Sequence, residues 1–238
     1  RAADAFELTD RALREAGAGE ADALIFCYPN NPTGAVMDAD ALAPVAEFAR
    51  EHDLTVIADE IYAALTYGGE HDSIATLPGM RERTVVIGGF SKAYAMTGLR
   101  LGYALAPPEA IEAMNRIHQY TMLSAPTTAQ FAGLEAIRSC DDAVAEMRDA
   151  YDRRRRYVLS RFREMGLDCF EAEGAFYVFP ECPGDDEAFA EDLLTEEGVA
   201  VVPGSVFGEG GEGHLRVSYA TGMDELREAT ARIERFLD

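Results

Sequence analysis

The sequence predicts an α/β chain in which a large domain with a mainly parallel sheet is followed by a small α+β domain. In the first half, short apolar runs alternate with segments of helical spacing, which is the pattern of a parallel sheet covered by helices. Helical patterns fill the middle of the chain, and strands and helices mix in the last third. With 238 residues and 48% hydrophobic content, the chain can bury a core in each of two domains.

The large domain is predicted over residues 1–145. Four apolar runs are expected to be its buried strands: residues 23–27, 55–58, 84–87 and 102–106. Segments with apolar residues at helical spacing are expected to be helices: residues 39–51, 109–119, 127–138 and 141–165. The last of these is long enough to join the two domains.

The small domain is predicted over residues 146–238. Its expected strands are residues 167–171, 176–179, 200–202 and 215–219, and its expected helices are residues 186–197 and 223–237. The Gly-Glu run at 208–213 is expected to be a hairpin connection. The arginine run at 153–156 has acidic neighbours and helical spacing, which predicts a solvated helix face rather than a nucleic-acid contact.

The acidic excess of the chain limits its partners. The sequence holds 43 acidic and 21 basic residues, a formal net charge of -22. This charge argues against nucleic acids and anionic membranes as partners. Such a surface suits a very salty cytoplasm, where ions screen the self-repulsion, so we hypothesise a halophilic protein. An ordinary acidic bacterial protein is the alternative.

Cysteine usage indicates a reducing compartment. The four cysteines lie far apart without a CxxC pair, and the four histidines are scattered. We therefore expect neither a metal site nor a disulfide framework, and a cytoplasmic location. No apolar run approaches about 18 residues and no signal peptide opens the sequence, so we expect neither membrane insertion nor secretion.

Lys92 is the only lysine, beside 20 arginines. An average composition would place roughly 15 lysines in a chain of this length. Arginine replaces lysine as a surface charge but not as a nucleophile, because its guanidinium stays protonated. Lys92 is therefore a candidate nucleophile before any motif is considered.

Four polar motifs follow or lie within predicted strands, and each has a structural alternative. The segment 28–34, Tyr-Pro-Asn-Asn-Pro-Thr-Gly, could be only a turn. The segment 59–62, Asp-Glu-Ile-Tyr, places a carboxylate at the end of a buried strand, where it needs a capping role or a cationic partner. The segment 88–92, with Arg100 beyond it, could cradle a phosphate or be an ordinary loop. Arg216 alternates with apolar residues, which a solvated strand face would also explain.

In order and content these motifs resemble those of fold type I enzymes that depend on pyridoxal 5′-phosphate (PLP), the class I/II aminotransferases of the aspartate/aromatic type in particular. The resemblance covers essentially the whole chain and implies the fold type I PLP-dependent transferase fold, with an incomplete large domain. The matching residues are Asn-Pro-Thr-Gly at 31–34, Asp-Glu-x-Tyr at 59–62, Ser91 with Lys92, Arg100 and Arg216.

The resemblance implies which residues bind and activate the cofactor. Lys92 would bind PLP covalently and then move the proton from the substrate Cα to the cofactor C4′. Asp59 would pair with the protonated pyridine nitrogen of PLP. Tyr62 and Asn31 would hydrogen-bond the 3′-oxygen of the ring.

The resemblance also implies how phosphate and substrate are held. Ser91 and Arg100 would bind the phosphate, and Arg216 would bind the α-carboxylate of the substrate through a two-pronged pair, with Asn31 beside it. The Asn31–Pro32 bond is expected to be cis. Gly89 departs from the family, in which this position is often serine, so backbone amides would replace one phosphate hydroxyl.

A second departure concerns the start of the chain. Only 30 residues precede Asn31, and the first residue is not methionine. Family members have a much longer segment there, which supplies the aromatic ring that stacks on PLP. We therefore expect a fragment or truncated product that does not transaminate alone, and a homodimer when the chain is full length.

The expected reaction transfers an amino group between an L-amino acid, aspartate-like or aromatic, and a 2-oxo acid such as 2-oxoglutarate. The segment 118–126 resembles the aspartate/aromatic subgroup, which also includes aminotransferases acting on acylated diaminopimelate. Tyr62 favours aminotransferases over acyl-condensing and several lyase relatives, which carry histidine there. A PLP-binding sensing domain of a transcription regulator is a further alternative. Phe176 and Tyr177 line the pocket or belong to a core strand.

Overall fold

A computed structural model describes residues 2–238 and divides into two compact units. The large unit comprises Glu7–Pro29 and Met37–Glu146. The small unit comprises the chain up to Phe6, Asn30–Val36 and Met147–Asp238. Each unit has a sheet of its own.

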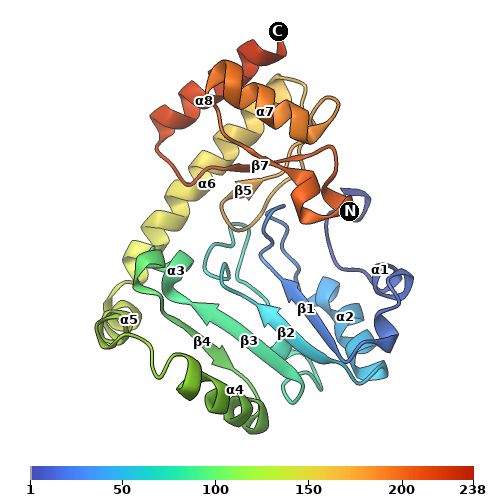
Figure 1. Cartoon of the computed structure of the whole chain (residues 1–238), viewed down its shortest axis with the longest axis vertical. Coiled ribbons are helices and arrows are strands. Elements are labelled where there is room, and N and C mark those ends of the chain that lie inside the picture. The colour runs from blue at the N-terminus through green and yellow to red at the C-terminus, as the bar shows by residue number, and fades with distance from the viewer. Residues whose placement is uncertain (1) are drawn as a thin grey trace. The chain divides into compact units, whose positions relative to one another are not determined.

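The large unit is built on four strands that lie side by side in chain order (Figure 1). They are β1 (Ala23–Cys27), β2 (Thr55–Asp59), β3 (Thr84–Gly89) and β4 (Gly102–Leu105). The first three are parallel and β4 is antiparallel to β3, so the predicted α/β class with a mainly parallel sheet is confirmed. The register pairs Cys27 with Asp59 and Asp59 with Ile87. The carboxyl ends of the parallel strands are therefore level, and residues that follow them meet at one edge.

Helices of the large unit flank this sheet. They are α1 (Asp10–Glu15), α2 (Ala39–Glu51), α3 (Phe90–Ala93), α4 (Pro108–Thr121) and α5 (Thr127–Ser139), with 3₁₀ turns at Ala18–Glu20, Ile74–Thr76 and Thr97–Leu99. Helix α2 begins where the Asp38 carboxylate accepts the Ala41 N–H at 2.8 Å, and it buries Leu42, Val45 and Phe48. Each such side chain stabilises the unit by about 1.5–3 kcal/mol relative to exposure.

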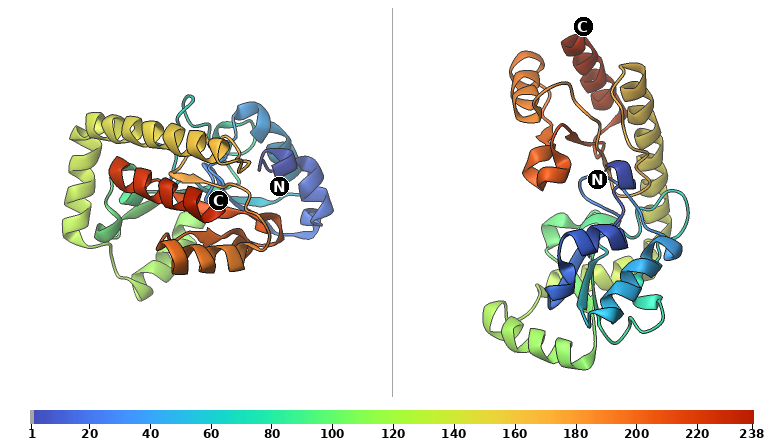
Figure 2. Two further views of the ribbon diagram at one scale, coloured as in Figure 1. Left: turned by 90° about the horizontal axis from the view of Figure 1, so that it is seen from above. Right: turned by 90° about the vertical axis from the view of Figure 1, so that its right-hand side faces the viewer.

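The small unit has a three-stranded antiparallel sheet with the order β5-β7-β6. Its elements are the end of α6 (Asp141–Glu164), β5 (Tyr177–Val178), α7 (Asp186–Glu197), β6 (Val202–Pro203), β7 (Leu215–Ser218) and α8 (Met223–Leu237), with 3₁₀ turns at Ala2–Asp4, Gly204–Phe207 and Glu209–Gly211. Helix α6 is one continuous helix that begins in the large unit (Figure 2).

Helix α8 buries one face against the rest of the small unit. Leu226, Thr230 and Ile233 recur at helical spacing and are all buried. The Thr230 hydroxyl lies 3.0 Å from the Tyr157 hydroxyl on α6, which gives the buried threonine a hydrogen-bond partner. These contacts join the two longest helices of the unit.

Three local predictions are corrected or refined. No strand forms over 167–171, where the described chain has only an isolated bridge between Cys169 and Pro180. The glycine-rich run connects the antiparallel strands β6 and β7, as the hairpin prediction expects, but it does so through two 3₁₀ turns. A Cβ added at Gly204 would lie 2.0 Å from the Gly211 carbonyl oxygen. This backbone contact, which only glycine permits, compacts the connection.

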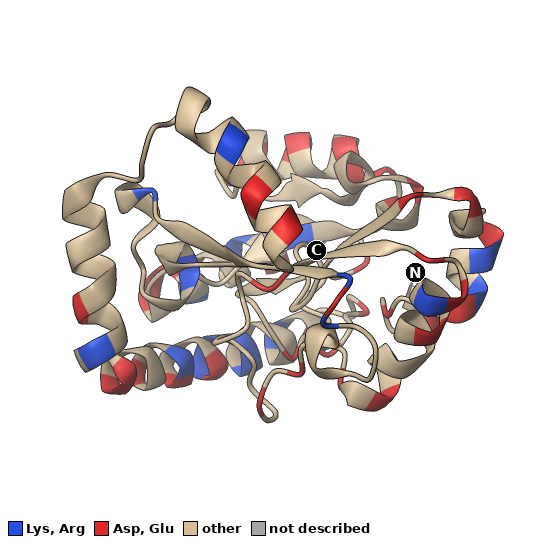
Figure 3. Ribbon diagram, turned by 90° about the horizontal axis from the view of Figure 1, so that it is seen from below, with Lys and Arg blue, Asp and Glu red and all other residues tan. Residues whose placement is uncertain are grey.

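The arginine run on α6 is the third correction. Acidic and basic residues both occur along this helix (Figure 3), and Arg156 is solvated as predicted. Arg155 is not, because its side chain is only 11% exposed. It pairs with Asp152 and Glu171 and donates to the Ala172 carbonyl at 2.8 Å. A fully paired cation is tolerated at a nearly buried position.

No helix among residues 2–238 combines the length and the apolar composition that crossing a bilayer requires.

Candidate active site

Asp59 is the last residue of β2, the central parallel strand of the large unit. Its carboxylate accepts the N–H of Ile61 at 3.1 Å, which turns the chain sharply at the end of the strand. Tyr62 follows in this turn and is buried. The turn therefore holds both predicted cofactor residues of this motif at the carboxyl edge of the sheet.

Lys92 lies one strand away, in the helical turn α3 that begins directly after β3. Its Nζ is 5.7 Å from the centroid of the Tyr62 ring. The structure thus brings Lys92 and Tyr62 together across 30 positions of sequence, as the motif order predicts. The aromatic face attracts the ammonium and limits the volume in which it moves.

Ser91 and Arg100 are joined through Thr97. The Thr97 hydroxyl donates to the Ser91 carbonyl at 2.9 Å, and the Arg100 guanidinium donates to the Thr97 carbonyl at 2.7 Å. Arg100 has a φ of 54°, a left-handed conformation that turns the chain into β4. Ser91 and Arg100 line the same cavity of about 620 Å³. A hydroxyl and a guanidinium beside one cavity are suitable ligands for a phosphate.

Local packing at position 89 favours glycine over a residue with a side chain. A Cβ there would lie 3.1 Å from Ile61 Cδ1 and 3.4 Å from the Gly102 Cα. A serine would require these neighbours to move by a few tenths of an ångström. This close approach is a physical reason for the departure from the family pattern.

The other predicted site residues, Asn31 and Arg216, belong to the small unit. Arg216 Nη1 donates to Asn31 Oδ1 at 2.9 Å, although 185 positions separate the two. The Asn31–Pro32 bond is cis as predicted, and so is Tyr28–Pro29. Gly34 has a φ of 74°, and its carbonyl accepts the N–H groups of Glu173 and Gly174, which anchors the motif within the unit.

Two aromatic rings surround Arg216 on β7. Its Cζ is 4.8 Å from the centroid of Tyr177 and 5.1 Å from that of Phe207. Among the residues that the structure describes, Asn31 is its only hydrogen-bond partner and no carboxylate pairs with it. The guanidinium is therefore a partly buried cation with donors available for an anion.

Sequence reasoning missed Phe207, which lies in the glycine-rich connection between β6 and β7. Nothing in its immediate sequence marks it, because the contact with Arg216 depends on how the two 3₁₀ turns fold. The sequence is compatible with either a core or a pocket position for Tyr177. In the structure this residue is buried and its ring also faces Arg216.

Asp186, also missed, fixes the connection that carries Phe207. This buried carboxylate accepts the N–H of Ser205 at 2.7 Å and that of Gly213 at 3.5 Å. Burial acts to raise the pKa of Asp186, but these hydrogen bonds outweigh it and hold the pKa below its usual value. In the sequence, Asp186 resembles an ordinary acidic residue of a first helical turn.

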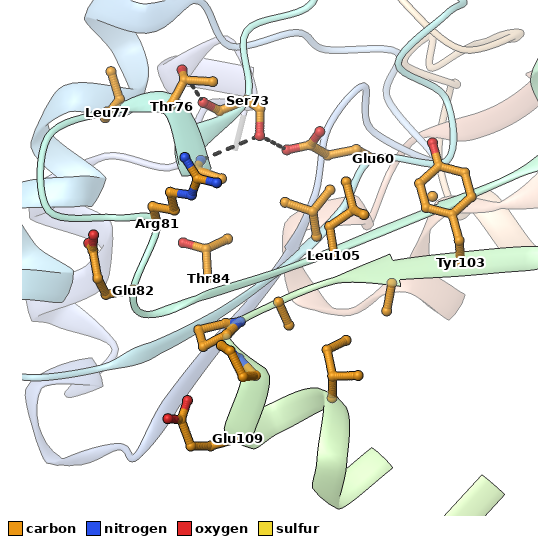
Figure 4. Close-up of a pocket in the computed structure, with 18 of the residues that line it drawn as sticks. Glu60, Ser73, Thr76, Leu77, Arg81, Glu82, Thr84, Tyr103, Leu105 and Glu109 are labelled. Carbon is orange, nitrogen blue, oxygen red and sulfur yellow. Dashed lines mark hydrogen bonds between the residues drawn. The ribbon is translucent and has the colours of Figure 1, made fainter. Parts of the chain in front are cut away.

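A second cavity of the large unit, about 1220 Å³, contains none of the predicted site residues (Figure 4). Glu60 extends into it, accepting the Ser73 hydroxyl at 2.6 Å, with His71 Nε2 3.1 Å from its carboxylate. Asp59 and Glu60 are neighbours in the chain, yet Glu60 interacts with this structural cluster. Only Asp59 is part of the candidate site.

Comparisons with known proteins identify the family of this chain. The family model described as aminotransferase class I and II matches residues 4–233. The aspartate aminotransferase of Pyrococcus abyssi is 45% identical over 98% of this chain and 61% of its own length. The aromatic-amino-acid aminotransferase 2 of Thermococcus litoralis is 46% identical over 90% of this chain and 57% of its own.

A solved structure is similar over the whole chain. The aromatic aminotransferase from Pyrococcus horikoshii superposes with a TM-score of 0.97 at 44% identity, covering 100% of this chain and 65% of that one. The chain thus spans less than two thirds of the length of these relatives. Their names favour neither the diaminopimelate nor the sensing-domain alternative. This chain belongs to the class I and II aminotransferases.

Proposed function

We propose that the chain is part of a PLP-dependent aminotransferase that moves an amino group between an L-amino acid and a 2-oxo acid such as 2-oxoglutarate. The observation that carries the proposal is the position of Lys92, the only lysine, at the start of α3 with its Nζ 5.7 Å from the Tyr62 ring. Every other basic position has been occupied by arginine, which cannot replace a lysine nucleophile.

The residues of the large unit fit PLP as a cofactor. A lysine, a carboxylate at a strand end and a hydroxyl with a guanidinium beside one cavity are the groups that an aldehyde, a pyridine nitrogen and a phosphate require. When bound, PLP supplies an aldehyde for the substrate amine and a ring that accepts the electron pair released at Cα. The carboxylate of Asp59 would keep the ring nitrogen protonated, because opposite charges favour the ionised forms of both groups.

Lys92 would hold the cofactor and then carry the proton from the substrate Cα to C4′. The Tyr62 ring limits where its amino group moves, which keeps the base close to the reacting carbon. The Tyr62 hydroxyl would donate a hydrogen bond to the 3′-oxygen of the ring. These assignments give one amino group two tasks, in covalent binding and in proton transfer.

In the small unit, Arg216 would bind the α-carboxylate of the substrate. Asn31 accepts from Arg216 through Oδ1, so its amide N–H groups are oriented away from the guanidinium. Those N–H donors suit the anionic 3′-oxygen of the cofactor.

We propose aspartate-like or aromatic amino acids as substrates because two relatives with 45% and 46% identity are named for aspartate and for aromatic amino acids. A homodimer of the full-length protein follows from the family resemblance. A cytoplasmic location is supported by four free cysteines, and adaptation to high salt by the net charge of -22.

The proposal can be tested on the chain itself. We would incubate the 238-residue protein with PLP, reduce it with borohydride and map the modified peptides by mass spectrometry. The expected result is a pyridoxyl adduct on Lys92. The control variants Lys92→Ala and Lys92→Arg should carry no adduct at position 92. The N-terminal amine serves as an internal reference, because it reacts without the site.

Substrate choice needs a longer protein that includes any upstream segment. We would add L-aspartate and L-phenylalanine separately to that protein and follow the cofactor absorbance. A change of the cofactor absorbance on addition of either amino acid supports the proposal if the change is absent in Lys92→Ala. An adduct distributed equally between Lys92 and the N-terminal amine, or turnover in the alanine variant, contradicts it.

A further inference from the structure

Phe207 is an aromatic residue without a place in the core. It ends the 3₁₀ turn Gly204–Phe207, and 39% of its surface is exposed. Its ring centroid is 5.1 Å from Cζ of Arg216, while Tyr177, on β5, has its centroid 4.8 Å from the same atom. A guanidinium at these distances from two aromatic faces is attracted by both ring quadrupoles.

We propose that Phe207 and Tyr177 form an aromatic clamp, in which they act as positioning residues that hold the Arg216 guanidinium in one orientation for a carboxylate ligand. The inference rests on the proposed role of Arg216 in carboxylate binding. It adds two residues that touch the arginine rather than the reacting atoms, and it assigns a task to the glycine-rich connection between β6 and β7.

The clamp complements the hydrogen bond from Asn31. That bond fixes one nitrogen, Nη1, at 2.9 Å from Asn31 Oδ1, but a single contact still allows the planar group to tilt. The two rings oppose this tilt because the cation loses its contact with their faces when it turns. The remaining donors, on Nε and Nη2, are then preorganised for a two-pronged pair, so less rotational entropy is lost on binding.

The turn that carries Phe207 is itself fixed. The Asp186 carboxylate accepts the N–H of Ser205 at 2.7 Å and the N–H of Gly213 at 3.5 Å, on either side of Phe207 in the chain. Gly204 and Gly211 approach so closely that a Cβ on either would lie within about 2.2 Å of a backbone oxygen of the other. A turn held by a buried carboxylate and by backbone contact can place one ring reproducibly.

A purely structural role for Phe207 is the competing explanation. Its ring makes an edge contact with Phe179, at 6.3 Å between centroids, and this contact needs only an apolar side chain. Leucine would preserve such a contact but has no π face for the cation. Tyrosine would preserve the face. The pair Phe207→Leu and Phe207→Tyr therefore separates the two explanations.

The first measurement requires no ligand. We would label the 238-residue chain with ¹⁵N and measure rotation about the Nε–Cζ bond of Arg216 by NMR, assigning its signal from Arg216→Gln. In Phe207→Leu this rotation should accelerate about 2- to 30-fold, which is the range of one cation–π contact. In Phe207→Tyr the rate of this rotation should remain within about twofold of the parent rate.

Arg155 supplies the internal control. It lies in the same unit and is held by Asp152, Glu171 and the Ala172 carbonyl. Its rotation should be unchanged in both variants, which also shows that the unit is folded. Phe207→Met, which is flexible and apolar, gives the same comparison if Phe207→Leu loses the Arg155 signal.

The second measurement distinguishes failure of the clamp from failure of the proposed function. Maleate, a dicarboxylate, is titrated into the parent, Phe207→Leu and Arg216→Gln. The clamp predicts a dissociation constant raised about 2- to 30-fold by Phe207→Leu, and the function predicts that Arg216→Gln abolishes binding. Unchanged rotation in Phe207→Leu overturns the clamp. Faster rotation while Arg216→Gln still binds maleate retains the clamp and rejects the role of Arg216.

Discussion

The predicted site residues of the large unit and those of the small unit are positioned in different ways. In the large unit, Asp59 and Lys92 take their positions from strand ends that the register makes level. In the small unit, Arg216 lies on β7, which pairs with β6 over only two residues. The residues around its guanidinium, Asn31, Tyr177 and Phe207, come from three distant segments of the chain. Backbone geometry therefore dominates one half and side-chain packing the other.

This difference determines how each half should respond to substitution. Where the sheet sets the position, changing a functional side chain removes its chemistry and leaves the scaffold intact. Where packing sets the position, a change outside the site can displace the functional group. Four predictions test this contrast, one in the large unit and three in the small unit, and the largest effect is expected in the large unit.

The first prediction compares the neighbours Asp59 and Glu60. Asp59→Asn should weaken PLP binding about 10²- to 10³-fold, because it leaves a buried cationic ring nitrogen without its partner. Glu60→Gln should change PLP binding by less than about threefold and lower stability by about 1–2 kcal/mol, since it weakens the contacts with Ser73 and His71. Absorbance titration with PLP and urea unfolding measure the two effects. Equal losses of PLP affinity would contradict the distinction between the two carboxylates.

The second prediction concerns the connection between β6 and β7. Gly204→Ala should destabilise the chain by about 2–4 kcal/mol, because its Cβ would lie 2.0 Å from a backbone oxygen that cannot move independently. Gly69→Ala is the matched control: a Cβ there meets nothing within 4 Å, so its effect should be within about 0.5 kcal/mol. Thermal unfolding of both variants measures the difference. A Gly204→Ala variant as stable as the control would show that the connection is not compact.

The same contrast explains how much the sequence predicted. The helices 39–51, 186–197 and 223–237 begin and end at the predicted residues, because capping residues and amphipathic spacing are local signals. The strands before Asp59 and Lys92 were predicted over 55–58 and 84–87, and the structure extends them to Asp59 and Gly89, since polar motifs follow apolar runs directly. Local patterns were therefore sufficient for the half that the sheet positions.

Tertiary interactions decided what the sequence could not predict. The segment 167–171 has strand composition but pairs only through Cys169, and Arg155 looks solvated until the chain at 171–172 packs on it. Phe207 and Asp186 have no local signal, because their tasks depend on contacts with Arg216 and Ser205. The roles of the predicted site residues stay predictions until they are measured.

The third prediction removes the planar group of Arg216 and keeps its charge. Arg216→Lys should weaken maleate binding about 10- to 100-fold, because an ammonium offers no two-pronged pair and loses the bond to Asn31 Oδ1. Arg227→Lys is the control, since that arginine is exposed and pairs only within α8. Calorimetric titration measures both. A lysine variant that binds as tightly as the parent would mean that charge alone, without orientation, defines this half of the site.

The smallest effect is expected at Asp186, through the pH dependence of stability. Its pKa is held below the unfolded value of about 3.9, so the carboxylate contributes stability above that pH and loses it as the pH falls through the lower, folded pKa. Asp186→Asn should therefore cost about 1–2 kcal/mol at neutral pH and progressively less in acid, because the parent loses the charged hydrogen bonds there as well. Asp185→Asn, which keeps a capping oxygen for the Ala188 N–H, should show no such convergence. Urea unfolding of the parent and the variants across acidic pH measures the free energy of unfolding at each pH. If this free energy depends on pH in the same way in Asp186→Asn and in the parent, the connection carrying Phe207 is held by backbone contact rather than by this carboxylate.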